Sequence, residues 1–321
     1  MLKILALEGG GILAINFLIG LRKLSVEFDK QKKDLLDYFD VYSGVSSGAI
    51  IAAAFAVREK VLSHLLKIDE SLMNEILFMS RVPKCKFQEW KKRIREHKQK
   101  CSTLIINLLI YIFRNKSQDI FELNDPSNQL PIIGTKYTNK KYYLFKKYID
   151  FNMKDIPNKR ILVVKTFNLK ELKIDIFSNY QNLGSKYSRN IADIVDWSSN
   201  APTYFPNNGV HVDGGNFINS SFLTEKQIFT GKDLIFFSIG SKFSKINLPL
   251  NEEYKWFQNL VNVFYNLGKQ IDKITNDKYF HLSFDFKNYH LDDFQLLPEI
   301  CQNAENIDIS NAIQFIHNHI I

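Results

Sequence analysis

One serine in the sequence has the surroundings of a catalytic nucleophile. Ser46 is flanked by Gly44 and Gly48 in "GVSSG", which fits the G-x-S-x-G pattern of a nucleophile elbow, and an apolar run precedes it while a helix-forming run follows it. Such a turn is strained, and side chains at the two glycine positions would collide with the neighbouring strand and helix. Ser47 has the same hydroxyl chemistry without the flanking glycines. The pattern therefore favours Ser46 as the nucleophile of an acyl-transfer reaction.

A serine hydroxyl needs a base that accepts its proton, and histidine is the usual base. None of the seven histidines lies in a setting typical of that role. Asp213 is the better candidate, because it ends a short predicted strand in "HVDGG" and is followed by Gly214 and Gly215, close to backbone donors. His211 is predicted to face the same side of this strand, where packing is its expected role.

Three consecutive glycines, Gly9, Gly10 and Gly11, separate a predicted strand from a predicted helix in "LALEGGGILA". Glycine permits a sharp turn and leaves backbone N–H groups bare at a helix N-terminus, where an anion or a developing oxyanion is favoured. Phosphate binding and acyl transfer both use this arrangement. Dinucleotide binding fits less well, because G-x-G-x-x-G would need a glycine where the chain has Ala14, and Glu8 would repel a pyrophosphate.

Apolar strands must alternate with helices to position these residues. The composition and spacing predict strands at residues 3–8, 35–44, 140–151, 160–179, 209–215 and 233–242, and helices at 12–28, 47–57 and in the first part of 191–206. Beyond about residue 250 the pattern is helical. The alternation predicts an α/β fold with a mostly parallel sheet covered on both faces.

The stretches "LEGGGILA", "GVSSG" and "VDGG", in this order, resemble the patatin-like phospholipases, serine acyl hydrolases with a Ser–Asp dyad and no histidine. "SSNAPTYFP" and "LIFFSIGSK" are similar to further segments of this family, so the resemblance covers about residues 2–245. It implies a three-layer α/β/α sandwich with a mostly parallel central sheet. The chain departs from the family pattern at Leu13 and Ala14, where the family has an arginine and a glycine.

The resemblance also implies a function. Ser46 would be the nucleophile, Asp213 the general base and the glycine turn 9–11 the oxyanion hole of a lipid acyl hydrolase of the phospholipase A or lysophospholipase type, without a cofactor. The supporting glycines would be Gly44, Gly48, Gly214 and Gly215. The alternative hypothesis is a catalytically weak storage or interaction protein of the same fold that binds membranes. That hypothesis predicts loss of the nucleophile or the base, and both are present.

The composition indicates where such a protein acts. The formal net charge of +8, from 42 Lys and Arg against 34 Asp and Glu, suits an anionic partner such as a phospholipid surface. Three widely spaced cysteines argue against a disulfide framework or a zinc site, and no acidic or histidine cluster has metal-ligand spacing, so we expect no metal. No signal peptide is evident, and the longest apolar run away from the glycines, residues 102–113, is shorter than the about 20 residues of a membrane span. We expect a cytoplasmic, peripherally membrane-associated protein.

A basic segment at residues 84–100 has eight Lys and Arg against two Glu. A solvated helix packed through an apolar stripe would explain it. The functional hypothesis is an interfacial element that docks on anionic lipid through Trp90, Lys91, Lys92 and Arg93. No recognised nucleic-acid-binding module surrounds these charges, so nucleic acid is not expected as a partner. The sequence leaves an activating protein or a homodimer open.

The predicted site residues are spread over about 200 positions, which leaves no room for a domain boundary between them. We therefore expect a patatin-like phospholipase domain at residues 1–245. Residues 246–321 would form a C-terminal helical extension packed on the same domain.

Overall fold

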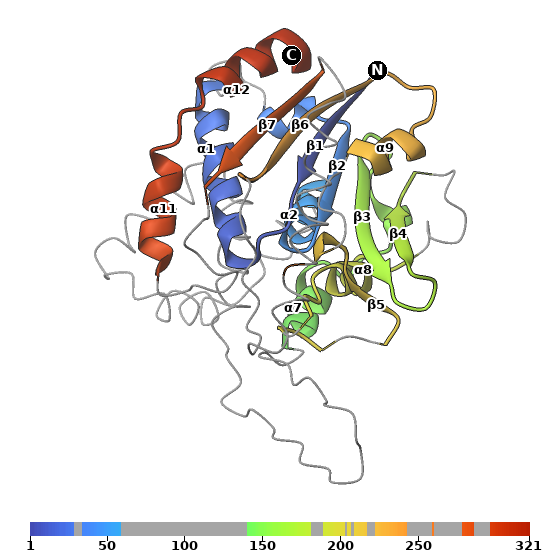
Figure 1. Cartoon of the computed structure of the whole chain (residues 1–321). Coiled ribbons are helices and arrows are strands. Elements are labelled where there is room, and N and C mark those ends of the chain that lie inside the picture. The colour runs from blue at the N-terminus through green and yellow to red at the C-terminus, as the bar shows by residue number, and fades with distance from the viewer. Residues whose placement is uncertain are drawn as a thin grey trace, which may run out of the picture.

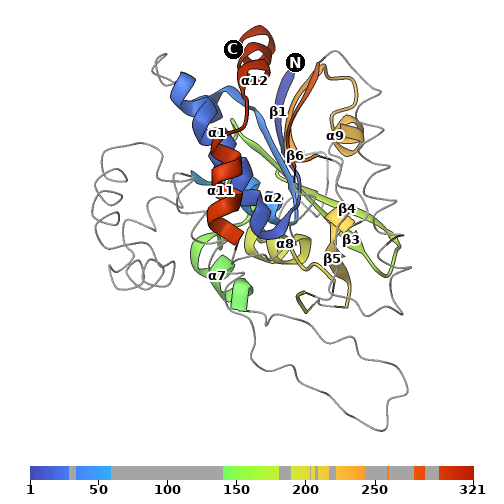
Figure 2. The ribbon, with the colours of Figure 1, turned by 60° about the vertical axis from the view of Figure 1, so that its left-hand side comes forward.

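The computed structural model describes residues 1–28, 34–58, 140–180, 189–202, 204–206, 209–216, 222–242, 259, 278–285 and 296–321. In this part of the chain, a seven-stranded sheet lies between helices on its two faces (Figures 1 and 2). The arrangement is the predicted α/β/α sandwich.

The sheet runs in the order β4-β3-β2-β1-β6-β7, and β5 pairs with β3. Strand β1 pairs in parallel with β2 and β6, β2 with β3, and β6 with β7, whereas β3 pairs antiparallel with both β4 and β5. The prediction of a mostly parallel sheet is therefore confirmed. The strands are β1 (Leu2–Leu7), β2 (Val41–Val45), β3 (Ile161–Asn168), β4 (Lys173–Ser178), β5 (His211–Asp213), β6 (Leu234–Ser241) and β7 (Tyr279–Phe284).

Helices cover both faces of this sheet. The α-helices are α1 (Ile15–Phe28), α2 (Ser47–Ala56), α7 (Lys140–Tyr148), α8 (Ile191–Ser198), α9 (Phe222–Ile228), α11 (Leu297–Glu305) and α12 (Ser310–Phe315). Short 3₁₀ turns lie at η1 (Gly11–Ala14), η3 (Leu35–Tyr38), η4 (Met153–Asp155) and η6 (Gly214–Asn216), and a π-helical turn, η9 (Ile316–Ile320), follows α12. Among the described helices, none combines the length and the hydrophobicity needed to cross a membrane.

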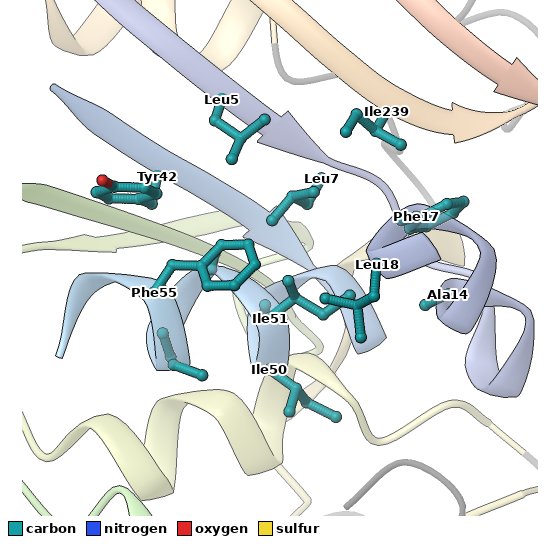
Figure 3. Packing of buried hydrophobic residues seen from close by; sticks show 14 of the residues in the cluster. Leu5, Leu7, Ala14, Phe17, Leu18, Tyr42, Ile50, Ile51, Phe55 and Ile239 are labelled. Atoms are coloured by element: carbon teal, nitrogen blue, oxygen red, sulfur yellow. The ribbon is translucent and has the colours of Figure 1, made fainter. Parts of the chain in front are cut away.

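Two apolar cores hold the layers together, one on each face of the sheet. Leu5 and Leu7 of β1 face the larger core, where they pack with residues of α1 and α2 such as Leu18 and Phe55 (Figure 3). The alternate residues of β1 face a smaller core that includes Phe229, directly after α9. Because both faces are covered, β1 is apolar almost throughout, as expected for a central parallel strand.

Residues 140–148 of the segment 140–151 form a helix, α7, and the strand predicted there is wrong. Its tyrosines and phenylalanine favour a strand, but Lys141, Phe145 and Tyr148 are all buried and recur at helical spacing. The buried lysine on this face concealed the amphipathic pattern. Burial against α8 therefore decided the secondary structure of this segment.

Three other predictions need correction. The predicted strand at 160–179 divides into β3 and β4, which pair antiparallel on either side of a turn. The predicted strand at 35–44 divides into η3 and β2, because the Asp34 carboxylate accepts a hydrogen bond from the Leu36 N–H and favours a 3₁₀ turn before the strand. The C-terminal part is not helical throughout, since β7 extends the sheet beyond β6. The "YFHLSF" sequence of β7 has little alternation, and its strand structure depends on pairing with β6. The domain boundary predicted at residues 245 and 246 lies outside the described residues.

Candidate active site

Ser46 lies at the sharp turn between β2 and α2. Its backbone has φ 56° and ψ −131°, a left-handed conformation that is strained for a residue with a side chain. A Cβ on Gly44 would lie 2.3 Å from the Gly48 carbonyl oxygen, and a Cβ on Gly48 would lie 2.2 Å from the Leu7 carbonyl oxygen. The two glycines are therefore required by the close approach of β2, α2 and β1, as the G-x-S-x-G pattern predicts.

Asp213 is brought to Ser46 by the pairing of β5 with β3. Asp213 is buried at the end of β5, opposite Thr166 of β3, and its carboxyl is close enough to Ser46 for the Ser46 side chain to lower its pKa. The Gly215 N–H donates a hydrogen bond to Asp213 Oδ1 at 2.8 Å. The structure thus brings the predicted nucleophile and the predicted base together, with a backbone donor on the carboxylate.

Burial raises the pKa of the Asp213 carboxyl from 3.8 to about 6. The hydrogen bonds from Ser46 and Gly215 and the positive charge of Lys141 act in the opposite direction and limit this rise. A carboxyl with a pKa near 6 is ionised at neutral pH, yet it holds a proton more readily than an ordinary aspartate. Such a pKa suits a general base.

The glycine turn lies directly against Ser46. A Cβ on Gly9 would stand 2.7 Å from Ser46 Cβ and 3.3 Å from Ser46 Oγ, so only glycine leaves the Ser46 side chain in place. The Gly10 N–H donates to Ser47 Oγ at 3.0 Å, and Gly11 has φ 57° and begins η1. The structure therefore brings the predicted turn and the predicted nucleophile together. It also gives Ser47 a role in the turn, where its buried hydroxyl accepts this hydrogen bond.

Glu8 connects the glycine turn to β6. Its buried carboxylate accepts a hydrogen bond from the Ser241 N–H at 3.1 Å and lies 3.9 Å from His281 Nε2. It also occupies the space beside Gly240, where a Cβ would be 2.0 Å from Glu8 Oε2. Leu13, at the position of the family arginine, is buried in the larger core. The glycine turn is thus held in place by the packing of Leu13 and by the hydrogen-bonded carboxylate of Glu8.

His211 packs beside the site and does not join Ser46. Its Nε2 atom lies 3.1 Å from Asp175 Oδ2, and its ring stacks on Trp197 with 4.7 Å between the centroids. The expectation that His211 serves in packing agrees with these contacts. Within the described part of the chain, no group of three or more histidine, cysteine or acidic residues is arranged to hold a metal ion.

Two residues of the site were missed in the sequence. The Ser198 hydroxyl accepts a hydrogen bond from the Ser46 N–H at 3.0 Å and donates one to the Lys165 carbonyl oxygen at 2.7 Å. Lys141 is buried and acts electrostatically on Asp213. The "SSNAPTYFP" similarity could have pointed to Ser198, whereas Lys141 gave no signal. The proposed membrane-docking residues Trp90, Lys91, Lys92 and Arg93 lie outside the described residues.

Comparisons with known proteins identify relatives of this chain. The Patatin-like phospholipase family model matches residues 5–224. Patatin-like protein 3 of Arabidopsis thaliana is 26% identical over 210 residues, which cover 64% of this chain and 44% of that protein. Patatin-like protein 1 of the same plant is 26% identical over 212 residues, or 64% and 43%. The chain thus spans less than half the length of these relatives.

Among solved structures, VipD from Legionella pneumophila is similar at 14% identity and a TM-score of 0.39, covering 99% of this chain and 67% of that one. The family match covers more than half of this chain and contains the glycine turn, Ser46 and Asp213. The chain therefore belongs to the patatin-like phospholipase family.

Proposed function

We propose that this protein is a serine-type lipid acyl hydrolase that cleaves fatty-acyl esters through Ser46 and Asp213. The observation that carries the proposal is the approach of Ser46, on its strained turn, to the buried Asp213, whose pKa burial raises to about 6 and the Ser46 side chain lowers. Family membership supports hydrolysis of lipid esters in general, and phospholipids are the substrates that we expect first, ahead of lysophospholipids and neutral glycerides.

The reaction would take place in two steps. Ser46 Oγ attacks the ester carbonyl carbon while its proton passes to Asp213, and collapse of the tetrahedral intermediate expels the alcohol, which takes that proton. A covalent acyl-enzyme remains on Ser46. Water then attacks the acyl carbon, gives a proton to Asp213, and displaces Ser46 Oγ, which recovers the proton. The fatty acid leaves and the enzyme is regenerated.

The oxyanion of each tetrahedral intermediate would accept hydrogen bonds from N–H groups of the turn formed by Gly9, Gly10 and Gly11. Loss of one such donor costs about 3–4 kcal/mol of transition-state stabilisation in comparable sites. In the structure the Gly10 N–H is bonded to Ser47 Oγ. We propose that this bond keeps the turn in position in the resting enzyme, and the Gly10 N–H must leave Ser47 to reach an oxyanion.

A pair of adjacent serine variants tests this function. Wild-type protein, Ser46→Ala and Ser47→Ala are incubated with mixed phospholipid vesicles, and the released fatty acids and lysophospholipids are measured by mass spectrometry. We expect release by wild-type and by Ser47→Ala, and none above background by Ser46→Ala. Equal release by wild-type and Ser46→Ala would show that the proposed chemistry is wrong and would favour the storage or interaction hypothesis.

The partner that we propose is an anionic phospholipid surface. The net charge of +8 and the basic segment at residues 84–100 support this proposal. Charge reversal at Lys91, Lys92 and Arg93 should weaken binding to anionic vesicles and leave hydrolysis of a soluble ester unchanged. Unchanged vesicle binding would refute the docking role, and loss of both properties would indicate misfolding.

A further inference from the structure

The end of α8 and the two residues that follow it contact both members of the Ser46–Asp213 pair. The Ser198 hydroxyl accepts the hydrogen bond of the Ser46 N–H at 3.0 Å, and the Asn200 carbonyl oxygen accepts that of the Asp213 N–H at 3.1 Å. Both Ser198 and Asn200 are buried. We call residues 198–200 the clamp turn. Because its two contacts are only two residues apart, the position of this turn sets the spacing between nucleophile and base.

Lys141 of α7 donates hydrogen bonds to the clamp turn and to Asp196, which lies just before it. Its buried Nζ atom donates to the Asp196 carbonyl oxygen at 3.0 Å, to Asp196 Oδ1 at 2.8 Å and to Ser199 Oγ at 3.0 Å. The other carboxylate oxygen of Asp196 accepts from Asn200 Nδ2 at 3.3 Å. A continuous path of hydrogen bonds therefore leads from Lys141 through Asp196 and Asn200 to the Asp213 N–H. Helix α7 lies against α8 in both views (Figures 1 and 2).

Burial of the Lys141 ammonium is energetically unfavourable. An ammonium loses its hydration when it is buried, and this desolvation lowers the pKa of Lys141 in spite of the attraction of Asp196. The Phe205 ring, with its centroid 4.9 Å from Nζ, encloses the charge further. Apolar residues of similar volume in place of both Lys141 and Asp196 would often serve stability equally well, whereas loss of one partner leaves the other charge buried and unpaired. A lysine here therefore suggests a role beyond packing.

We propose that Lys141 is a positioning residue of the active site, which holds the clamp turn in register so that Ser46 and Asp213 meet, and which supplies positive charge behind Asp213. This inference rests on the proposed function, since it assigns Lys141 to the same reaction. It adds a residue to that function, because Lys141 would act through Ser46 and Asp213 and would touch neither the substrate nor the reacting atoms.

The charges around Asp213 indicate that Lys141 is the cation that affects the pKa of its carboxyl. Lys141 acts on Asp213 and lowers its pKa against the effect of burial. Among the described residues of β3 and β5, Lys165 forms an ion pair with Glu225, and the His211 ring contacts the Asp175 carboxylate. Asp196, the acid that faces Lys141, is its direct partner. Removal of the Lys141 charge should therefore raise the pKa of Asp213 further.

The experiment compares wild-type protein with Lys141→Met, which keeps most of the side-chain volume and removes the ammonium. The steady-state constants and the pH profile are measured for hydrolysis of a soluble p-nitrophenyl ester, and the rate of covalent labelling by a fluorophosphonate is measured in parallel. For Lys141→Met we expect kcat to fall by about tenfold or more with KM within about twofold. The midpoint of the acidic limb should move to higher pH by about 0.5 unit or more.

Arg58→Met is the matched control for the loss of a buried cation. Arg58 is buried two residues beyond the C-terminal end of α2, where it donates to the Tyr42 hydroxyl at 3.1 Å and forms an ion pair with Asp37. At 1.5 Å per residue, α2 separates it from Ser46 by about 15 Å. This variant should lose thermal stability, while its kcat and acidic limb match those of wild-type.

The outcomes separate the two proposals. Absence of labelling in wild-type protein would overturn the proposed function and this inference with it. A different result would overturn this inference alone. In that case wild-type protein is labelled, and folded Lys141→Met keeps the kcat and acidic limb of wild-type or matches those of Arg58→Met. If Lys141→Met does not unfold cooperatively, Ser199→Ala replaces it, because it deletes one acceptor of Nζ. That variant must then lower kcat by about threefold or more at constant KM, and an unchanged kcat would overturn the inference.

Discussion

Replacement of Asp213 by asparagine should stabilise the protein at neutral pH while it abolishes the proposed activity. Asparagine has the same shape, and its oxygen can still accept the Gly215 N–H, which lies 2.8 Å from Asp213 Oδ1. It cannot accept the Ser46 proton. The variant therefore removes the buried charge and the base with little change in packing.

The magnitude follows from the pKa of Asp213, which is 3.8 for an ordinary aspartate and about 6 in the folded protein. Between these values the folded state binds more protons than the unfolded state, so wild-type stability falls as pH rises through this window. A difference of about 2 units, at 1.36 kcal/mol each, amounts to about 3 kcal/mol. Asp213→Asn escapes this loss, so its free energy of unfolding relative to wild-type should increase by about 3 kcal/mol between pH 4 and pH 8.

The assay is urea unfolding of wild-type and Asp213→Asn at several pH values from 4 to 8. Asp150→Asn is the control with the opposite sign. Asp150 is exposed, and hydrogen bonds from Asn190 and Lys146 lower its pKa, so its carboxylate stabilises the fold above its unfolded pKa. Asp150→Asn should therefore become slightly less stable than wild-type as pH rises.

A stability difference between Asp213→Asn and wild-type that stays constant from pH 4 to pH 8 would refute this reasoning. It would mean that Asp213 ionises in the folded protein as it does in an unfolded chain. The bonds from Ser46 and Gly215 and the charge of Lys141 would then fully offset the desolvation of the carboxyl.

Three further predictions concern the same site. Activity on a soluble ester, as kcat/KM, should rise about tenfold per pH unit below about pH 6 and level off above it, because Asp213 must be ionised to act as a base; a limb near pH 4 would contradict this. Ser47→Ala should lower kcat by about tenfold or less, because the Gly10 N–H loses its acceptor. Ser46→Ala should abolish fluorophosphonate labelling. The reverse ranking of the two variants would make Ser47 the nucleophile. Gly9→Ala should destabilise the protein by about 1–3 kcal/mol and slow labelling, because the new Cβ would stand 2.7 Å from Ser46 Cβ; thermal unfolding and labelling rates that match wild-type would show that the turn can move.

The local parts of the site could be predicted from the sequence. Backbone conformation within a few residues depends on those residues, so the flanking glycines identified the turn at Ser46, and the three glycines identified a turn before a helix. The apolar strands and their alternation with helices indicated a mostly parallel sheet. The order of the three motifs then placed the chain in its family.

Other features were decided only by the tertiary structure, because they depend on neighbours that are distant in the chain. The pairing of β5 with β3 brings Asp213 to Ser46, and burial there raises the pKa of Asp213 to about 6. The composition of segment 140–151 predicts a strand, but burial against α8 favours a helix over residues 140–148. This helix places Lys141 in contact with the clamp turn. Whether a lysine is solvated or buried beside an aspartate depends on what packs over it, and that information is spread over the whole chain.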